Sequence, residues 1–214
     1  DDKGDLHISD MGGRRVLKLD RRGRLTVIAG TGEGGFGGDA KKAQINLAMA
    51  VAVSPDGAVY VSDAANSRIR RVSPDGVIQT VVGYGPAQDT YGAGFAGDGG
   101  PAEKAKIFSA TDLKFDAAGA LYISDSGNNR IRVIRAGVVT TVAGSGRQGF
   151  SGDGGKALEA ELNTPQKVAV AKDGSLFIAD RANHRVRKVD SRGAIITIAG
   201  AGQGSGMMLD PTIR

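Results

Sequence analysis

The chain has 214 residues, of which 40% are hydrophobic, 24% are charged and 5% are aromatic, and its formal net charge is +5. This apolar content is enough for a substantial core in one domain, so the composition excludes a disordered chain. The sequence has no cysteine, which excludes disulfides and thiolate metal sites. The moderate positive charge permits an acidic partner but does not specify one.

Four similar segments follow one another along the chain, and they end at Gly30, Gly83, Gly144 and Gly200. Each segment contains three short apolar runs separated by polar turns, a pattern typical of antiparallel strands. A fourth run precedes the second, third and fourth copies at residues 50–53, 112–115 and 167–170, and a glycine-containing turn joins it to the copy. We therefore expect a four-stranded meander in each full repeat and a first copy that lacks its leading strand.

The second strand of every repeat carries mostly apolar residues on both faces. One face has Leu6, Val59, Leu121 and Leu176, and the other has His7, Tyr60, Tyr122 and Phe177. A sheet with two apolar faces needs a neighbour on each side, so the repeats are expected to stack radially as a β-propeller, with an open array as the alternative. The repeats extend approximately over residues 1–47, 48–108, 109–163 and 164–214 and form a single domain.

Four motifs of the chain resemble those of the bacterial type of NHL-repeat protein. They are the connector Gly97-Asp98-Gly99-Gly100-Pro101-Ala102, the strand start Leu162-Asn163-Thr164-Pro165, the strand Leu121-Tyr122-Ile123-Ser124-Asp125 and the turn and strand Asn128-Asn129-Arg130-Ile131-Arg132. The resemblance covers nearly the whole chain and implies an all-β propeller of four-stranded antiparallel blades. Family members usually have about six blades. We therefore expect a fragment, or a chain whose ring needs further copies.

An aspartate at the end of each second strand is followed five residues later by an arginine. The pairs are Asp10 and Arg15, Asp63 and Arg68, Asp125 and Arg130, and Asp180 and Arg185. This spacing predicts a side-chain clasp across the turn between strands two and three. Because the pair occurs in every repeat, we interpret it as part of the fold, and we predict no catalytic residue.

The glycine-rich connectors supply a second repeated aspartate, at Asp39, Asp98 and Asp153. An aspartate in such a loop can cap a short helix, which is the interpretation we favour. The alternative is a calcium-type site in which backbone carbonyls and waters complete the oxygen ligands. A zinc site is a weaker possibility, since the chain has only two histidines, and no cofactor is expected.

Positions that differ between repeats are better candidates for ligand binding than positions that recur. In a propeller, the connectors and the turns after strand two are expected to lie on one face, beside the mouth of the central channel. The variable residues there are Asp112, Gln166, Lys167, Arg181 and His184, and we take them as the hypothetical ligand-facing set. His7 occupies a position that is aromatic in the other repeats, so we expect it to be a packing residue.

These features favour a non-catalytic binding or scaffold propeller that recognises a protein or a small ligand through this face. Propellers carry unrelated functions, so two alternatives stay open. One is a metal-assisted lyase or hydrolase whose remaining ligands lie in further blades, and the other is an RNA-binding propeller that combines positive charge with connector aromatics. No membrane insertion is expected. The resemblance to exported bacterial proteins implies a periplasmic or extracellular location.

Overall fold

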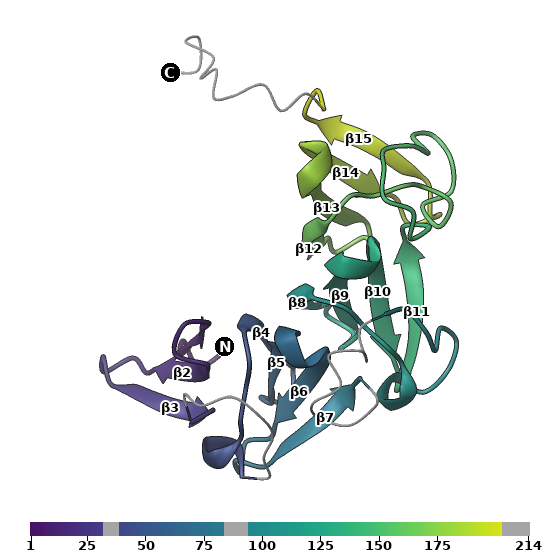
Figure 1. Cartoon of the computed structure of the whole chain (residues 1–214). Coiled ribbons are helices and arrows are strands. Elements are labelled where there is room, and N and C mark those ends of the chain that lie inside the picture. Colours follow the sequence, from purple (N-terminus) through teal and green to yellow (C-terminus); the bar gives the residue numbers. More distant parts are fainter. Residues whose placement is uncertain (32–38, 84–93, 203–214) are drawn as a thin grey trace.

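The computed structural model describes residues 1–31, 39–83 and 94–202, and these residues form four antiparallel sheets arranged in an open arc (Figure 1). The first sheet has three strands, β1 (Leu6–Asp10), β2 (Arg15–Leu19) and β3 (Leu25–Ala29). The predicted all-β architecture is confirmed. The first sheet begins with the equivalent of strand two, as expected.

The other three sheets each have four strands, and their order in space follows their order in the sequence, so every connection within a sheet is a hairpin. The second sheet contains β4 (Ala48–Val53), β5 (Val59–Asp63), β6 (Arg68–Val72) and β7 (Ile78–Val82). The third contains β8 (Ala110–Phe115), β9 (Leu121–Asp125), β10 (Arg130–Arg135) and β11 (Val138–Ala143). The fourth contains β12 (Pro165–Val170), β13 (Leu176–Asp180), β14 (Arg185–Val189) and β15 (Ile195–Ala199).

Strands β4, β8 and β12 lie on the concave side of the arc, and β7, β11 and β15 lie on its convex side (Figure 1). Each of the three inner strands begins two residues earlier than the sequence predicts. The register shifts between Ala48 and Val51, between Ala110 and Asp112, and between Pro165 and Lys167. A bulge of this kind interrupts the alternation of apolar and polar residues, which is why the pattern alone misses the first residues of these strands.

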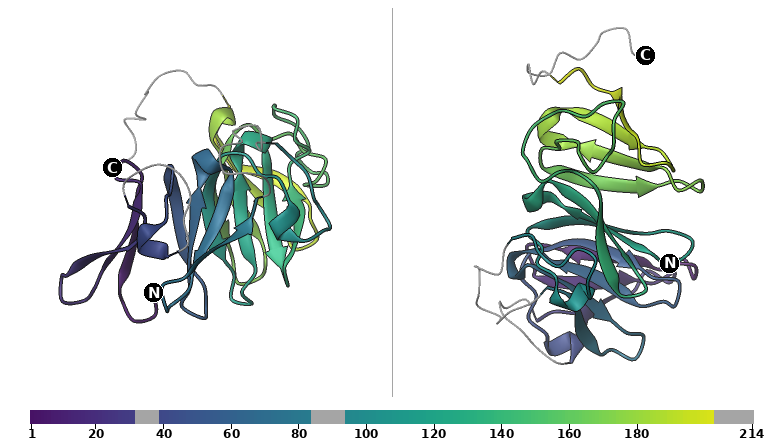
Figure 2. Two further views of the ribbon diagram at one scale, coloured as in Figure 1. Left: turned by 60° about the horizontal axis from the view of Figure 1, so that its bottom comes forward. Right: turned by 90° about the vertical axis from the view of Figure 1, so that its right-hand side faces the viewer.

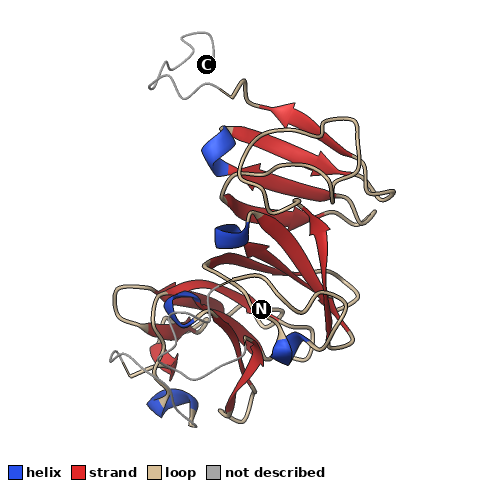
Figure 3. Cartoon of the chain, turned by 45° about the vertical axis from the view of Figure 1, so that its right-hand side comes forward, coloured by secondary structure: helices blue, strands red, loops and turns tan. Residues whose placement is uncertain are grey.

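Short 3-10 helices occupy two kinds of connection (Figure 3). Helices η2 (Ala64–Asn66), η5 (Ser126–Asn128) and η6 (Arg181–Asn183) follow the second strand of a sheet. Helices η1 (Ala40–Lys42) and η4 (Ala102–Lys104) lie in the connectors between sheets. Within the described ranges, no helix is long and apolar enough to span a membrane.

The sheets follow one another along the arc (Figure 2), and the hydrophobic core is divided into three clusters, one between each pair of successive sheets. Between the first and second sheets, Val16 of one sheet packs in the same cluster as Val61 of the next. The connector contributes Ala40, Ala43 and Ile45 to this cluster. Small alanine side chains allow the connector to pass between two sheets, so the connectors are part of the core as well as links.

Candidate functional site

A buried aspartate ends the second strand of sheets two, three and four. In the third sheet, Asp125 accepts hydrogen bonds from the backbone N of Phe108 (2.8 Å) and from Asn128 Nδ2 (2.9 Å), and Arg132 Nη1 lies 3.6 Å from its carboxylate. The equivalent residues make the same contacts in the other two sheets. They are Asp63 with Asn46 N, Asn66 and Arg70, and Asp180 with Asn163 N, Asn183 and Arg187. We call each set an aspartate network.

The aspartate networks change the partner that the sequence predicts. The ion pairs of Asp63, Asp125 and Asp180 are with arginines seven residues later, not five. The arginines at the predicted spacing, Arg68, Arg130 and Arg185, instead donate to the backbone oxygens of Asn66, Asn128 and Asn183. In the first sheet the ion pair does have the predicted spacing, between Arg15 Nε and Asp10 (2.9 Å).

The first sheet differs because two network residues are replaced there. Gly13 stands where the other sheets have asparagine, and Leu17 stands where they have the second arginine. Asp10 therefore accepts a hydrogen bond from the backbone N of Gly13 (2.8 Å) and pairs with the nearer arginine. The predicted five-residue spacing is therefore seen in the first sheet, where Leu17 replaces the second arginine, whereas the ion pairs of the other three aspartates are with a different arginine.

The second arginine also attaches the connector to the sheet. Arg132 is fully buried and contacts Asp98 (2.7 Å) as well as the backbone oxygens of Lys106 (2.7 Å) and Ala96 (3.1 Å). In the fourth sheet, Arg187 contacts Asp153 (2.8 Å) in the same way. Each buried guanidinium therefore bridges the aspartate of strand two and the aspartate of the connector.

Connector phenylalanines pack against the same arginines. Phe95 lies beneath Arg130, with 3.6 Å between the guanidinium carbon and the ring centroid, and Arg132 lies 4.9 Å from that centroid. Phe150 makes equivalent contacts with Arg185 and Arg187. Such contacts combine cation–π attraction with packing, so these rings help to attach the connector to the sheet.

The connector aspartates that could have bound calcium face protein donors. Asp98 and Asp153 pair with guanidinium groups, which occupy the side where a cation would bind. Asp39 accepts from the backbone N of Lys41 (3.0 Å) and so caps η1. Helix capping does not extend to Asp98, because η4 begins after Pro101. Among the described residues, no group of three or more His, Asp or Glu side chains could hold a metal ion.

Burial sets the protonation of the network carboxyls. Desolvation raises the pKa of Asp125 to about 6, against the opposing effect of its hydrogen bonds and of Arg132. The pKa values of Asp63 and Asp180 are raised for the same reason. The hydrogen bond from Arg15 lowers the pKa of Asp10, which lies nearer the surface. A raised carboxyl pKa often marks a catalytic acid, but here it follows from burial that Asp63, Asp125 and Asp180 share at equivalent positions of three sheets.

The two histidines lie in different sheets. His7 is half-buried on the face of β1 that is turned towards the second sheet, and burial lowers its pKa. Its nearest carboxylate is that of Asp1, 4.0 Å from Nδ1. His184 is exposed in the left-handed conformation (φ 51°) after η6. This separation does not provide a histidine pair for metal binding or for acid–base chemistry.

The structure brings three of the five variable residues together. Lys167 Nζ lies 3.1 Å from Asp112, and the backbone N of Val168 donates to the same carboxylate (3.0 Å). The backbone oxygen of Gln166 accepts from Thr111 Oγ1 (2.9 Å). These contacts join β8 to β12 at the end where both strands begin.

The other two variable residues, Arg181 and His184, are exposed on the turn that borders the start of β12. The backbone N of Ala182 donates to Asn163 O (3.0 Å), which places η6 beside this strand start. We call the surface formed by Asp112, Gln166, Lys167, Arg181 and His184 the variable rim. Within the part of the chain that the structure describes, no hydrogen bond or ion pair joins the two halves of this rim.

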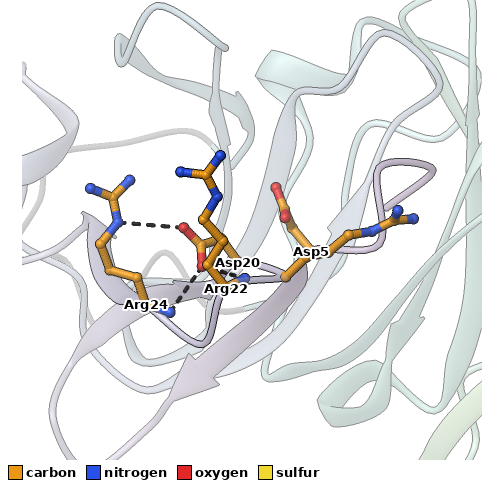
Figure 4. Close-up of a pocket in the computed structure, with 5 residues that line it drawn as sticks. Asp5, Asp20, Arg22 and Arg24 are labelled. Carbon is orange, nitrogen blue, oxygen red and sulfur yellow. Dashed lines mark hydrogen bonds and ion pairs between the residues drawn. The ribbon is translucent and has the colours of Figure 1, made fainter.

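A hollow of about 430 Å³ near the β2–β3 hairpin was not expected from the sequence (Figure 4). It is lined by Asp5, Asp20, Arg21, Arg22 and Arg24. Its acids already have partners, because Asp20 accepts from the backbone N of Arg24 (2.9 Å) and Asp5 pairs with Lys18 (2.5 Å). The arginine-rich turn is the sequence feature that could have indicated this hollow, but Asp20 accepts hydrogen bonds from the backbone N of Arg22 and of Arg24 and so stabilises the turn itself.

The family model of the teneurin NHL domain matches residues 139–209. Human teneurin-4 is 31% identical over 167 residues, and mouse teneurin-3 is 32% identical over 169 residues. Each match covers 72% of this chain, but the chain spans only 6% of the length of these relatives.

Solved structures give a fold match over a larger part of the chain. Virginiamycin B lyase from Staphylococcus aureus matches with a TM-score of 0.61 at 15% identity, covering 96% of this chain and 55% of the lyase. A Bacteroides thetaiotaomicron protein of unknown function matches with a TM-score of 0.62 at 19% identity, over 94% of this chain and 46% of that protein. At these identities the matches show the propeller fold alone.

Proposed function

Because the chain belongs to the NHL-repeat β-propellers, we propose that it is a non-catalytic scaffold that recognises a protein partner through the variable rim. The support comes from the contrast between buried and exposed residues around η6. Asp180 is fully buried in an aspartate network, whereas its neighbour Arg181 is exposed. Repeated residues fix the backbone of the turn, and the residues that differ between repeats project from it.

A fixed backbone lowers the entropic cost of binding, because the side chains that contact a partner are already placed. The aspartate network holds the turn through Asn183, and it holds the strand start through the backbone N of Asn163. Both halves of the variable rim are therefore attached to one buried carboxylate. This arrangement is suited to recognition of a preformed surface or an extended segment.

The charge of the variable rim favours an acidic partner. Lys167 keeps 59% of its side chain exposed despite its contact with Asp112, and Arg181 is also exposed. The formal net charge of the chain is +5. Exposed charges of this kind guide encounter and lose strength as salt is added. We therefore propose a protein segment that carries carboxylates as the partner.

Two observations weigh against the alternatives. RNA recognition would use aromatic faces for stacking, but the rings of Phe95 and Phe150 are each covered by a guanidinium at 3.6 Å. In a metal-assisted lyase the connector aspartates would be candidate ligands, but Asp98 and Asp153 each pair with a guanidinium group. The bacterial source and the location outside the cytoplasm stay predictions, because the teneurins named above are animal proteins.

A displayed library of random peptides tests the proposal, with the 214-residue chain as the target. We expect selected peptides to be rich in Asp and Glu, and their affinity to fall about tenfold, equivalent to about 1.4 kcal/mol, when Lys167 and Arg181 are both changed to Ala. The matched control is Arg192→Ala, which removes an exposed arginine from the turn at the opposite end of the fourth sheet. The proposal would be overturned if the selected peptides bound the Lys167 and Arg181 double variant as tightly as wild type but lost affinity for Arg192→Ala.

A further inference from the structure

A hollow of about 340 Å³ opens between the third and fourth sheets, at the end opposite the variable rim. Both of these sheets have four strands, so the hollow lies between two complete repeats. Its apolar lining consists of Val142 of the third sheet, Leu176 and Val189 of the fourth, and Leu158 of the connector. Leu176 and Val189 are each 4% exposed, whereas Leu158 is 54% exposed. The hollow therefore combines a buried apolar floor with an exposed apolar side chain.

The charged residues of the same lining are Asp190, Arg135, Lys156 and Arg192. The Asp190 carboxylate accepts hydrogen bonds from the backbone N of Arg192 and of Ala194 (2.9 Å each), so it is occupied within the β14–β15 turn. Lys156 Nζ lies 3.1 Å from Glu159, but both side chains are exposed and such pairs are weak. Three cations and one occupied carboxylate leave the hollow positively charged, and we call it the basic hollow.

Arg135 stands where the other sheets use a side chain to hold the turn after their third strand. The equivalent residues Asp20 and Asp190 accept hydrogen bonds from the backbone N atoms of their own turns. Ser73 Oγ likewise accepts from the backbone N four residues later (3.2 Å). An arginine side chain has no acceptor atom and cannot replace these groups.

The third sheet does not need such a group, because its turn is shorter. Arg135 pairs in register with Val138, and the loop between them is Ala136-Gly137, with φ angles of 47° and 78°. Two-residue turns with positive φ at both positions match the twist of the strands. Arg135 is therefore released from the turn, and its Nη2 donates to Tyr122 Oη (2.7 Å) beside the apolar floor. Within the described ranges Arg135 forms no ion pair, so it keeps donors for a ligand.

The equivalent hollow between the second and third sheets has different chemistry. Its volume is about 430 Å³, and Tyr60 lines it where the basic hollow has Tyr122. Its described lining contains no lysine or arginine, and Glu103 stands where the next connector has Leu158. Packing of two successive sheets therefore requires neither the positive charge nor the exposed leucine of the basic hollow.

We propose that the basic hollow binds a small organic acid, with its apolar body on the floor and its carboxylate at Arg135. Leu176, Val189 and Leu158 supply apolar contacts to the body of such a ligand. A guanidinium group can hold a carboxylate through two parallel hydrogen bonds. The volume lies within the range of small-molecule sites. This site is additional to the protein partner proposed for the variable rim.

Hydrocinnamate tests the proposal, because it joins a carboxylate to a compact apolar body. The measurement is a titration of the isotope-labelled chain, followed through the backbone amide signals of Gly174 and Gly193, which line the basic hollow. Two comparison probes separate the contributions. Hydrocinnamamide keeps the apolar body without the charge, and inorganic phosphate keeps a charge without the body. We expect saturable shifts with hydrocinnamate and much weaker binding of both comparison probes. Absence of saturable shifts at millimolar hydrocinnamate, or equal affinity for either comparison probe, would overturn the proposal.

Two exposed residues supply the variants. Arg135→Gln removes the charge, Leu158→Glu introduces a carboxylate at the edge of the floor, and each is expected to weaken hydrocinnamate binding at least about tenfold. The matched control is Arg147→Gln, because Arg147 is an exposed arginine of the same connector outside the lining. The control and the double alanine variant of Lys167 and Arg181 should bind like wild type, which separates this site from the variable rim. Wild-type affinity in Arg135→Gln, or an equal loss in Arg147→Gln, would contradict binding at the basic hollow.

Discussion

Asp10 and Asp125 occupy the same place in the repeat, yet burial gives their carboxyl groups opposite properties. Asp125 is completely buried, and desolvation raises its pKa to about 6. Asp10 is partly exposed, and its hydrogen bond from Arg15 lowers its pKa. The residue type is set by the repeat, but its energetic role depends on whether a preceding strand and a second arginine are present.

This difference predicts unequal costs for the same substitution. Asp125→Ala removes the acceptor for Phe108 N and Asn128 and leaves buried Arg132 with Asp98 as its carboxylate partner, so a loss of about 3 kcal/mol in unfolding free energy is expected. Asp10→Ala should lower the unfolding free energy by clearly less, because its donors, the backbone N of Gly13 and the side chain of Arg15, can hydrogen-bond to water instead. Urea unfolding of the two variants measures the difference. Equal losses of unfolding free energy would contradict a major contribution of the aspartate networks to stability.

The raised pKa of Asp125 also predicts a pH dependence. The carboxyl binds its proton more tightly in the folded chain, with a pKa of about 6 against 3.8 for the free group, so folding is coupled to proton uptake between these values. Its contribution to unfolding free energy should increase as the pH falls through this window, by at most about 1.4 kcal/mol per pH unit. Urea unfolding of wild type and Asp125→Asn from about pH 7 to about pH 4 isolates this carboxyl. A wild type that loses stability relative to the variant over that range would show a lowered pKa instead.

The sequence predicted the aspartates of the networks but not their arginine partners, which are Arg70, Arg132 and Arg187 rather than Arg68, Arg130 and Arg185. Residues five apart across a tight hairpin are opposite each other, and Arg130 does pair in register with Asp125 through the backbone. The side chain of Arg130 instead contacts Phe95 and donates to Ser145 O (2.7 Å). These partners come from other segments of the chain, so a local spacing cannot identify them.

At the scale of the element, the sequence placed the strands well and the connectors less well. Strand periodicity and glycine turns located every described sheet, because each strand buries apolar residues in a regular pattern. Gly144 shows why a glycine ends each copy, since its φ is 93° and an added Cβ would collide with the carbonyl oxygen of Asn129. The connector aspartates were harder to interpret, because their partner is a buried arginine of the following sheet.

The connectors also explain why the repeats exceed the length of a bare meander. The connectors before the third and fourth sheets insert alanines into a core between two sheets and present an aspartate and a phenylalanine to the arginines. A connector is therefore an element of the interface between sheets. Substitutions of these residues are expected to affect packing between two sheets rather than a ligand site.

At the scale of the whole molecule, four like sheets form an arc (Figure 1), and the variable rim lies where the inner strands β8 and β12 begin. Stacking of repeats was predictable from the two apolar faces of strand two. The variable residues were predictable as a set, but their separation into a contact between β8 and β12 and an exposed turn depends on the curvature of the arc.

The central claim is that repeated residues build the scaffold while variable residues recognise a partner, and the adjacent residues Asp180 and Arg181 test it most directly. Urea unfolding and affinity for an acidic peptide selected on the wild type should be measured on Asp180→Ala and Arg181→Ala. We expect Asp180→Ala to lose about 3 kcal/mol of unfolding free energy. Arg181→Ala should keep wild-type stability and lose peptide affinity. If Arg181→Ala binds the peptide as tightly as wild type, or if Asp180→Ala is as stable as wild type, the division between scaffold and recognition is contradicted.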